Sequence, residues 1–436
     1  KKMDFATIPV FQYGGMEHVG AIKYRESKWC LDKSATNSEK LSRGKLIANE
    51  TAHMWFGDLV TMKWFNEVWM KEVFANFMAD KIMNPAFPDI NHNLQFLTAH
   101  YSSAYDEDRT KGSHPIRQNL TNLKNAGSLY GSIIYNKAPI MMRQLETTMG
   151  KEVFQKGIQK YIQKYANSNA DWEDLVEILD KGTTLNMKKW SDVWVNQSGR
   201  ALFTDHIEYG DAQTIKNFVL RQQAEDGSPN VWPQIFEIGL VYPDTIKVIQ
   251  VNVNSRITEI KEAIGLQKPI SVIYNYNGYG YRVFPIDPNN LDKTPEIKDE
   301  VARAYSYINA YENTLTGKIT VVKAFDVFVK GIAVEQNELI VKLLSNQLSS
   351  IFWDFLTIKQ QVVAQAELEQ LLFKKLQTEI PSNIKKTIFG LFESIAYSKT
   401  GKEKLYQIWN KEIAIANLKL NEDDYINMAM DLAIYN

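Results

Sequence analysis

The sequence predicts an α+β protein of several domains, because three stretches of the chain differ in the periodicity of their apolar residues. Residues 1–201 mix short β-rich runs with amphipathic helices. Residues 202–290 carry short alternating runs between turn residues, and residues 296–436 show helical spacing almost throughout. We therefore predict a mixed domain, a β-sandwich and a C-terminal helical bundle or solenoid. The segment 287–295 is a linker.

In the first domain, two strands are predicted on either side of the glycine pair Gly14–Gly15, at residues 5–10 and 19–24. Thr36 followed by Glu39 is a capping-box pattern that begins a helix. We expect this helix to reach about Phe56, just before the stop signal Gly57. Further helices are predicted at residues 66–83, 91–105, 128–149, 151–165 and 172–181.

The second and third predicted domains differ in the elements that turn and helix-breaking residues separate. In the second, turn residues separate strands predicted at residues 216–222, 234–241, 245–253 and 270–276. In the third, helices are interrupted near Gly317, Pro381 and Gly401. We find no strict internal repeat, so the choice between a bundle and a solenoid stays open at this point.

Composition excludes several classes of protein. The 436 residues carry 50 Lys+Arg against 51 Asp+Glu, so no basic excess supports binding to nucleic acid. The single cysteine, Cys30, excludes an intrachain disulfide framework and a cysteine-rich metal site. No apolar run is long enough for a transmembrane helix, and the first residues lack the core of a signal peptide. We expect a soluble protein, whether cytoplasmic, periplasmic or secreted.

The candidate chemistry lies in residues 48–75. Asn49 and Glu50 are four and three residues before His53, so the three side chains share one face of a helix. Zinc peptidases place an imidazole at both ends of this spacing and use the intervening glutamate as a general base. Here Asn49 stands at the first imidazole position, and Glu72 on the next helix could complete a zinc site. Taken alone, such a short pattern is more often structural than catalytic.

Further motifs occur in a fixed order along the chain, and together they resemble the M1 family of zinc aminopeptidases. These gluzincins are typified by aminopeptidase N and leukotriene A4 hydrolase. GGMEH at residues 14–18 is similar to the family's G-x-M-E-N exopeptidase motif. The other matching segments are ETAHMWFGDLVTMKWFNEVWMKE at residues 50–72, SHPI at 113–116, YNK at 135–137 and WSDVWVNQSG at 190–199.

The resemblance implies a fold and an activity. Residues 1–201 would be a thermolysin-like catalytic domain that lacks its N-terminal part, followed by the β-sandwich and the helical domain. The family also has an N-terminal β-domain, which we expect in the parent protein. The implied reaction is zinc-assisted hydrolysis of the N-terminal peptide bond of a peptide with a free amino terminus.

The resemblance also implies roles for residues on the two helices. His53 and Glu72 would bind Zn²⁺, and Glu50 would be the general base that activates the zinc-bound water. Asn49 would be a weak ligand or none, because an amide offers only a neutral oxygen to a borderline-soft metal. We therefore expect low zinc occupancy, and we expect Asn49→His to restore a three-ligand site.

The remaining implied roles concern the substrate. Glu17 would bind the free α-amine of the peptide, because an ammonium removed from water needs a charged partner. Gly14, Gly15 and Met16 would form an extended edge that holds the peptide main chain. Tyr135 would donate its hydroxyl to the oxyanion of the tetrahedral intermediate.

The departures from the family pattern cluster near this chemistry. They are Asn49 at the first zinc histidine, Lys71 and Val73 on either side of the glutamate ligand, Ala138 after the tyrosine segment and His18 after the exopeptidase glutamate. Three hypotheses stay open. The chain is an aminopeptidase with a weakened zinc site, a pseudo-peptidase that binds peptides or a partner without turnover, or a helical scaffold.

Overall fold

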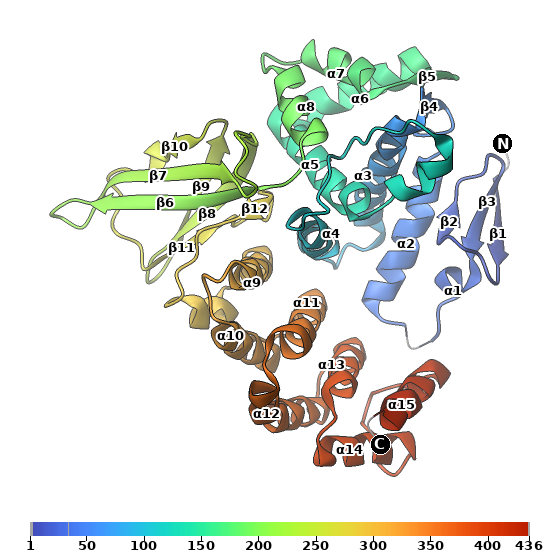
Figure 1. Ribbon diagram of the computed structural model, residues 1–436, viewed down its shortest axis with the longest axis vertical. Coiled ribbons are helices and arrows are strands. Elements are labelled where there is room, and N and C mark those ends of the chain that lie inside the picture. Colours follow the sequence, from blue (N-terminus) through green and yellow to red (C-terminus); the bar gives the residue numbers. More distant parts are fainter. Residues whose placement is uncertain (1–2, 34, 435–436) are drawn as a thin grey trace. The chain divides into compact units, whose positions relative to one another are not determined.

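The computed structural model describes residues 3–33 and 35–434 (Figure 1). It contains many helices, several small sheets and a C-terminal run of helices, which confirms the predicted mixed class. The chain divides into two compact units. One contains the residues up to Trp29 together with Leu41–Pro285, and the other contains Cys30–Lys40 together with the residues from Ile286 onward. The thermolysin-like, sandwich and solenoid assignments, and the domain boundaries, stay predictions.

The first sheet has three strands in the order β1-β3-β2. β1 (Asp4–Ile8) runs parallel to β3 (Ala21–Arg25), and β2 (Gly15–Met16) pairs antiparallel with β3. The predicted second strand began two residues too early, because the chain still turns at Gly20, whose φ is 84°. In the order of this sheet, β2 lies at one edge, and it directly precedes Glu17.

Helix α2 (Asn37–Ala52) begins at the predicted capping box. The Thr36 N–H donates to Glu39 Oε2 at 2.7 Å, and the Glu39 N–H donates to Thr36 Oγ1 at 3.2 Å. Each group satisfies a donor that the first turn of the helix leaves without an intrahelical partner. A sequence signal therefore fixes where this helix starts.

The predicted end of α2 is wrong, because the helix stops at Ala52 rather than near Phe56. The chain then turns through Gly57, whose φ of 128° favours a residue without a Cβ. The His53 N–H still donates to the Asn49 carbonyl at 3.1 Å, so His53 continues the last helical turn. Glu50 and His53 therefore keep the same side of the chain although the helix is shorter.

Among the other helices of this unit, α3, α4 and α5 pack against one another, and α6, α7 and α8 follow in a row from α5. The predicted helix at 128–149 begins late, because residues 133–137 form a π-helical turn, η3 (Ile133–Lys137), before the regular helix starts. The helices are α1 (Glu26–Trp29), α3 (Val68–Ala86), α4 (His92–Asp108), α5 (Ala138–Met149), α6 (Lys151–Tyr165), α7 (Trp172–Asp180) and α8 (Met187–Asn196). The short turns η1 (Phe65–Glu67) and η2 (Leu123–Leu129) precede α3 and η3.

Two further sheets follow, and Figure 1 shows their longest strands as neighbouring arrows. The first has the order β10-β7-β6-β12 and the second β11-β8-β9. The rings of Phe203, Phe236 and Phe284 lie 4.9 to 5.8 Å apart and join them in a common core. The strands are β6 (Ala201–Tyr209), β7 (Ile215–Ala224), β8 (Gln234–Val241), β9 (Ile246–Val253), β10 (Ile257–Glu259), β11 (Ser271–Tyr274) and β12 (Arg282–Val283). A small parallel pair, β4 (Val60–Met62) and β5 (Ser168–Ala170), lies beside α3.

The second unit is helical in the residues that the structure describes. Residues 30–40 belong to it, and the Ser38 N–H donates to Glu338 Oε1 at 3.2 Å. Its helices are α9 (Glu300–Leu315), α10 (Val321–Val334), α11 (Glu338–Ser350), α12 (Ile358–Leu376), α13 (Ser382–Ile395), α14 (Lys399–Trp409) and α15 (Glu422–Ile434). None of the helices in the described part of the chain has both the length and the apolarity of a membrane span.

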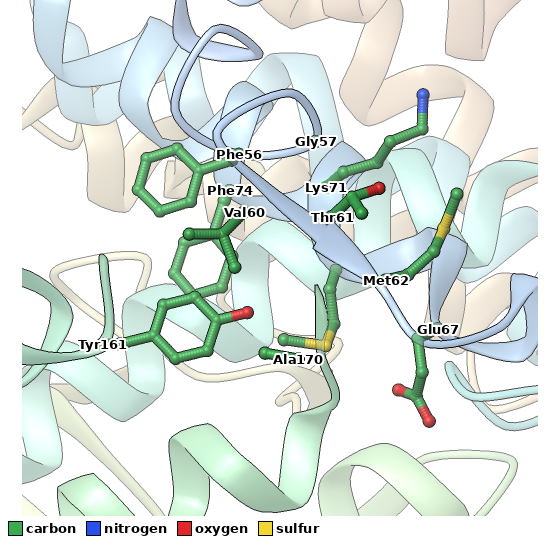
Figure 2. A pocket seen from close by; sticks show the side chains of 11 residues that line it. Phe56, Gly57, Val60, Thr61, Met62, Glu67, Lys71, Phe74, Tyr161 and Ala170 are labelled. Carbon is green, nitrogen blue, oxygen red and sulfur yellow. The ribbon is translucent and has the colours of Figure 1, made fainter. Parts of the chain in front are cut away.

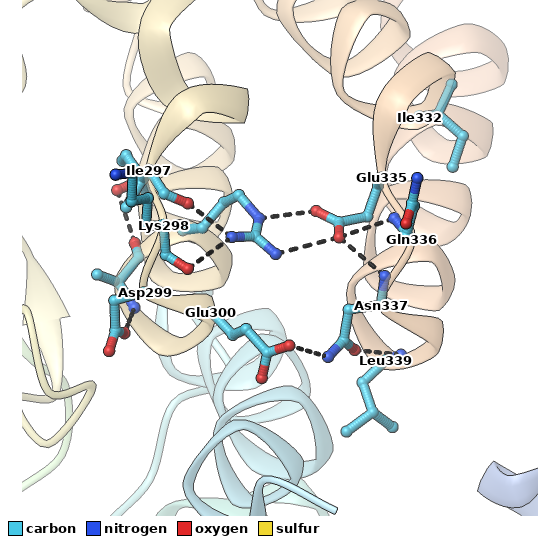
Figure 3. A network of polar contacts seen from close by, with 12 residues as sticks. Ile297, Lys298, Asp299, Glu300, Ile332, Glu335, Gln336, Asn337 and Leu339 are labelled. Atoms are coloured by element: carbon cyan, nitrogen blue, oxygen red, sulfur yellow. Dashed lines mark hydrogen bonds and ion pairs between the residues drawn. The ribbon is translucent and has the colours of Figure 1, made fainter.

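Polar contacts close the end of α10. The Arg303 guanidinium of α9 pairs with Glu335, with Nε–Oε2 at 2.8 Å and Nη2–Oε1 at 3.1 Å. Figure 3 shows Glu335 and Asn337 at this end of the helix. From α12, the Lys375 ammonium donates to the carbonyls of Ile332, Ala333 and Glu335 at 2.5, 3.1 and 3.0 Å. Lysine thus satisfies carbonyls that the end of a helix leaves unpaired.

Candidate active site

Four of the residues predicted to form the site lie together. Glu17, Glu50 and His53 bring potential ligand atoms within 4.8 Å of one another, so they form a possible metal-binding group. The His53 Nδ1–H donates to the Phe56 carbonyl at 3.0 Å. This bond leaves Nε2 facing Glu72, whose Oε2 lies 3.8 Å away. The histidine is thus oriented by its own backbone turn.

Gly15 allows Glu50 to lie against the edge strand β2. A Cβ at Gly15 would meet Glu50 Oε1, Cδ and Cγ at 2.3, 2.6 and 2.7 Å, closer than Cβ atoms come to other heavy atoms in proteins. The Glu50 side chain is buried, and its Oε2 has no hydrogen-bond partner among the described residues. Burial first, and then the charges of Glu17 and Glu72, raise the pKa of Glu50 to about 8. Its carboxyl group is therefore largely protonated near neutral pH.

Lys71 brings a positive charge into this group of carboxyls. Its Nζ contacts Glu17 Oε1 and lies 3.1 Å from Glu72 Oε1. Burial alone would lower the pKa of Lys71, but the charges of Glu72 and Glu17 raise it above its ordinary value. For Glu17, burial by itself would raise the pKa, but the charges of His53 and Lys71 outweigh burial and lower the pKa below its ordinary value. Glu17 and Lys71 are therefore a charged pair.

Asn49 points its amide elsewhere. Its Nδ2 donates to Asn76 Oδ1 on α3 at 3.2 Å. A catalytic zinc site requires three protein ligands. Of the three predicted positions only His53 and Glu72 carry strong donor groups, and Glu72 already pairs with Lys71. The donor set therefore does not fit the three-ligand zinc site that the sequence resemblance implies.

Tyr135 lies next to the predicted metal ligands. It belongs to the π-helical turn η3, and its side chain is partly exposed. Burial raises the pKa of Tyr135 well above its ordinary value, and the charge of Glu72, to which its hydroxyl is hydrogen-bonded, raises it further. Its ring stacks on Tyr130 with a centroid distance of 6.2 Å. The structure thus brings the predicted oxyanion donor to Glu72.

A buried network joins three of the sequence motifs, and sequence reasoning did not find its centre, Asp108. The Lys137 ammonium lies 2.8 Å from Asp108 Oδ2 and donates to the Gly199 carbonyl at 2.8 Å. Asp108 Oδ1 accepts from Ser113 Oγ at 2.7 Å and from the Gly199 N–H at 3.2 Å. The Tyr281 hydroxyl donates to Asp108 Oδ2 at 3.1 Å. No spacing pattern around Asp108 signals this role.

A cavity beside β4 is too small for a substrate side chain. Figure 2 shows Phe56, Phe74 and Tyr161 around it, with the Lys71 ammonium directed away. Its volume is about 20 Å³, enough for a single water molecule. This cavity therefore has no room for a bound side chain.

Comparison with known proteins agrees with the sequence resemblance. Residues 1–194 match the family model described as the Peptidase family M1 domain. Probable aminopeptidase 1 of Sulfurisphaera tokodaii is 27% identical over 81% of this chain and 43% of its own length. Aminopeptidase N of Streptomyces lividans is 27% identical over 80% of this chain and 42% of its own length. Aminopeptidase M1-D of Oryza sativa subsp. japonica is 37% identical over 52% of this chain and 26% of its own length.

The chain spans less than half the length of these curated relatives. The match to the family model covers the edge strand β2, both helices that carry the site and the π-helical turn η3. These first 194 residues thus match the peptidase domain of the M1 family, and the proteins that resemble the chain over a longer stretch are named aminopeptidases.

Proposed function

We propose that this chain forms the peptide-recognising cleft of an M1-type aminopeptidase, and that hydrolysis is weak or absent with Asn49 in place. The observation that carries the proposal is the position of Glu17 directly after the edge strand β2 (Gly15–Met16). An extended backbone edge and a carboxylate stand side by side there. Together they suit the first residues of a peptide with a free amino terminus.

Recognition follows from elementary chemistry. Within residues 3–33 and 35–434, no strand pairs with the outer edge of β2, so a peptide can add there as a further strand. Gly14 continues this edge, and its carbonyl accepts from the Arg25 N–H at 2.9 Å, which fixes the turn. The peptide's ammonium would then pair with Glu17 Oε2, the carboxylate oxygen other than the one that contacts Lys71.

The groups needed for hydrolysis are less complete than those needed for peptide recognition. The M1 family consists of zinc metallopeptidases, but this chain lacks the first imidazole ligand and has Asn49 bonded to Asn76. The missing ligand favours binding over turnover.

A second candidate function is hydrolysis with a weakly held Zn²⁺. The proximity of His53 Nε2 to Glu72, and of the Tyr135 hydroxyl to the same carboxylate, favours it. This candidate requires metal in the purified protein and turnover that depends on it.

Calorimetric titration with tetraalanine and N-acetyl-tetraalanine tests recognition. We expect the free peptide to bind at least about tenfold more tightly, because a lost charge-assisted contact is worth about 1.5–3 kcal/mol. Glu17→Gln should remove the difference, and Glu26→Gln on α1 is the matched control. Equal affinity of the two peptides for the unmodified chain would refute the role of Glu17.

Zinc content and turnover separate the two candidates. We expect protein purified without chelator to hold well under one Zn²⁺ per chain and to hydrolyse alanine arylamides at background rates. Stoichiometric zinc together with turnover of free but not acetylated peptides would establish the second candidate instead.

A further inference from the structure

The Lys71 ammonium occupies the centre of the candidate site. It contacts a carboxylate that follows β2, Glu17, and a carboxylate on its own helix α3, Glu72. The Lys71 side chain is only 18% exposed, and those of Glu17 and Glu72 are 13% and 8% exposed. A surface ion pair between two long side chains contributes little, but these three groups are mostly removed from water.

The fold makes room for this lysine. A Cβ at Gly57 would lie 3.3 Å from Lys71 Cδ and 3.5 Å from its Cβ. The turn after α2 thus passes close to the lysine stem, and the ammonium reaches the carboxylates. Without a cation, Glu17 and Glu72 would be two buried like charges near a third carboxyl group, Glu50, which is an unfavourable arrangement.

We propose that Lys71 supplies the cation of this site, holding Glu17 and Glu72 in place of a metal ion and preventing metal uptake. An ammonium and a divalent cation would compete for the same carboxylates, and Coulomb repulsion opposes their presence together. The inference rests on the proposed function only in reading Glu17 as part of the peptide site. Its consequence for metal binding stands independently.

Two separate obstacles to zinc follow. One is the missing imidazole at Asn49, and the other is the ammonium of Lys71. This inference changes the expectation, drawn above from the sequence, that Asn49→His alone restores a zinc site. We expect the single variant to remain largely free of zinc, because Glu72 is still paired with Lys71.

The test compares five proteins: the unmodified chain, Asn49→His, Lys71→Asn, Asn49→His/Lys71→Asn and Asn49→His/Lys71→Arg. Each is equilibrated with zinc chloride and desalted, and zinc per chain is measured by mass spectrometry. Melting temperature is measured with and without zinc. We expect near-stoichiometric zinc and a zinc-dependent rise in melting temperature only for Asn49→His/Lys71→Asn. The arginine variant keeps the positive charge and should stay at the level of Asn49→His.

Circular dichroism without zinc checks that each variant folds, and Lys71→Met replaces Lys71→Asn if the latter does not. Full zinc occupancy in Asn49→His alone, or equal occupancy in the asparagine and arginine double variants, would overturn the inference. Since none of these readouts involves a peptide, failure of the recognition experiment with tetraalanine leaves this result interpretable by itself.

Discussion

At the scale of single residues, the candidate site depends on one absent side chain. Gly15 has no Cβ, and the space is filled by Glu50 from α2. Their contact is not visible in the sequence, because the two residues are 35 positions apart. Their contact explains why the edge strand and the helix can approach closely enough to form a site.

Gly15→Ala should therefore destabilise the chain by about 1–3 kcal/mol, the usual cost of overpacking. The new Cβ would overlap three atoms of Glu50, so the whole side chain must move rather than its tip alone. Urea denaturation gives the change in free energy of unfolding. Gly14→Ala is the control, because its Cβ would lie 3.5 Å from Leu46, an ordinary contact. Equal stability of the two variants would contradict this account.

The sequence predicted which residues meet in the site, but not all of what they face. Helical spacing placed Glu50 and His53 together, and the family resemblance brought in Glu17 and Glu72. The roles of these residues in binding and catalysis stay predictions. Lys71 was noted as a departure from the family pattern, but spacing along a helix does not reveal the partner of a long, flexible side chain. Its ion pairs required the structure.

At the scale of elements, strong periodicity gave reliable predictions. The helix at residues 151–165 and the strand at residues 234–241 have the predicted bounds. The strand β6 was missed, because Thr204, Asp205 and Glu208 dilute its apolar alternation. The short strands β4, β5, β10 and β12 were missed because two or three residues are too few to show any period, whereas the extended edge at Gly15–Met16 was expected from the family resemblance.

Lys375 offers a test of how helix ends are stabilised. Lys375→Met removes three hydrogen bonds to the carbonyls at the end of α10 while keeping the apolar stem. Buried acceptors left without partners cost about 1–3 kcal/mol, so we expect a loss of stability of at least this size. Lys374→Met is the matched control, because Lys374 is the exposed neighbour on the same helix. A similar denaturation midpoint for both variants would rule out the role of the buried ammonium.

Glu393 on α13 predicts a pH dependence of stability. Burial first, and then Asp431 and Asp424, raise its pKa to about 8, although Lys386 lies 3.7 Å from Asp424. The folded state thus favours the protonated carboxyl group. Its contribution to stability is complete below the ordinary pKa of 4.5 and is lost as pH rises through about 8.

Glu393→Gln keeps a neutral side chain at every pH. We expect the variant to gain stability over the unmodified chain between about pH 5 and pH 8 in urea titrations, and the gain to level off above pH 8. In this range the unfolded state of the unmodified chain has released the Glu393 proton that the folded state still holds. Glu403→Gln, at an exposed position of α14, is the control. A stability difference that stays constant with pH would show that Glu393 does not titrate in this range.

At the scale of the whole molecule, apolar side chains around the first sheet lie open to water. Val10 is 96% exposed between β1 and β2, and Val19 is 78% exposed between β2 and β3. The M1 resemblance predicts an N-terminal β-domain in the parent protein, and we propose that this surface contacts it. Exposed apolar surface of this kind promotes association.

We therefore expect the 436 residues, expressed by themselves, to self-associate or melt at low temperature. Val10→Ser/Val19→Ser should reduce the associated fraction in sedimentation velocity experiments. Ile358→Ser/Val363→Ser is the control, because these residues of α12 are 79% and 80% exposed. If the control variant lowers association by the same amount, the surface around the first sheet is not its cause.

The buried network at Asp108 concerns the stability of the domain. Replacing Lys137 would leave the Asp108 carboxylate buried without its ammonium, at a cost of about 3–5 kcal/mol. A change at Asn49 affects one side-chain contact beside the cleft. Ser113 and Lys137 are therefore needed to hold the domain together through Asp108, whether or not the chain hydrolyses peptides.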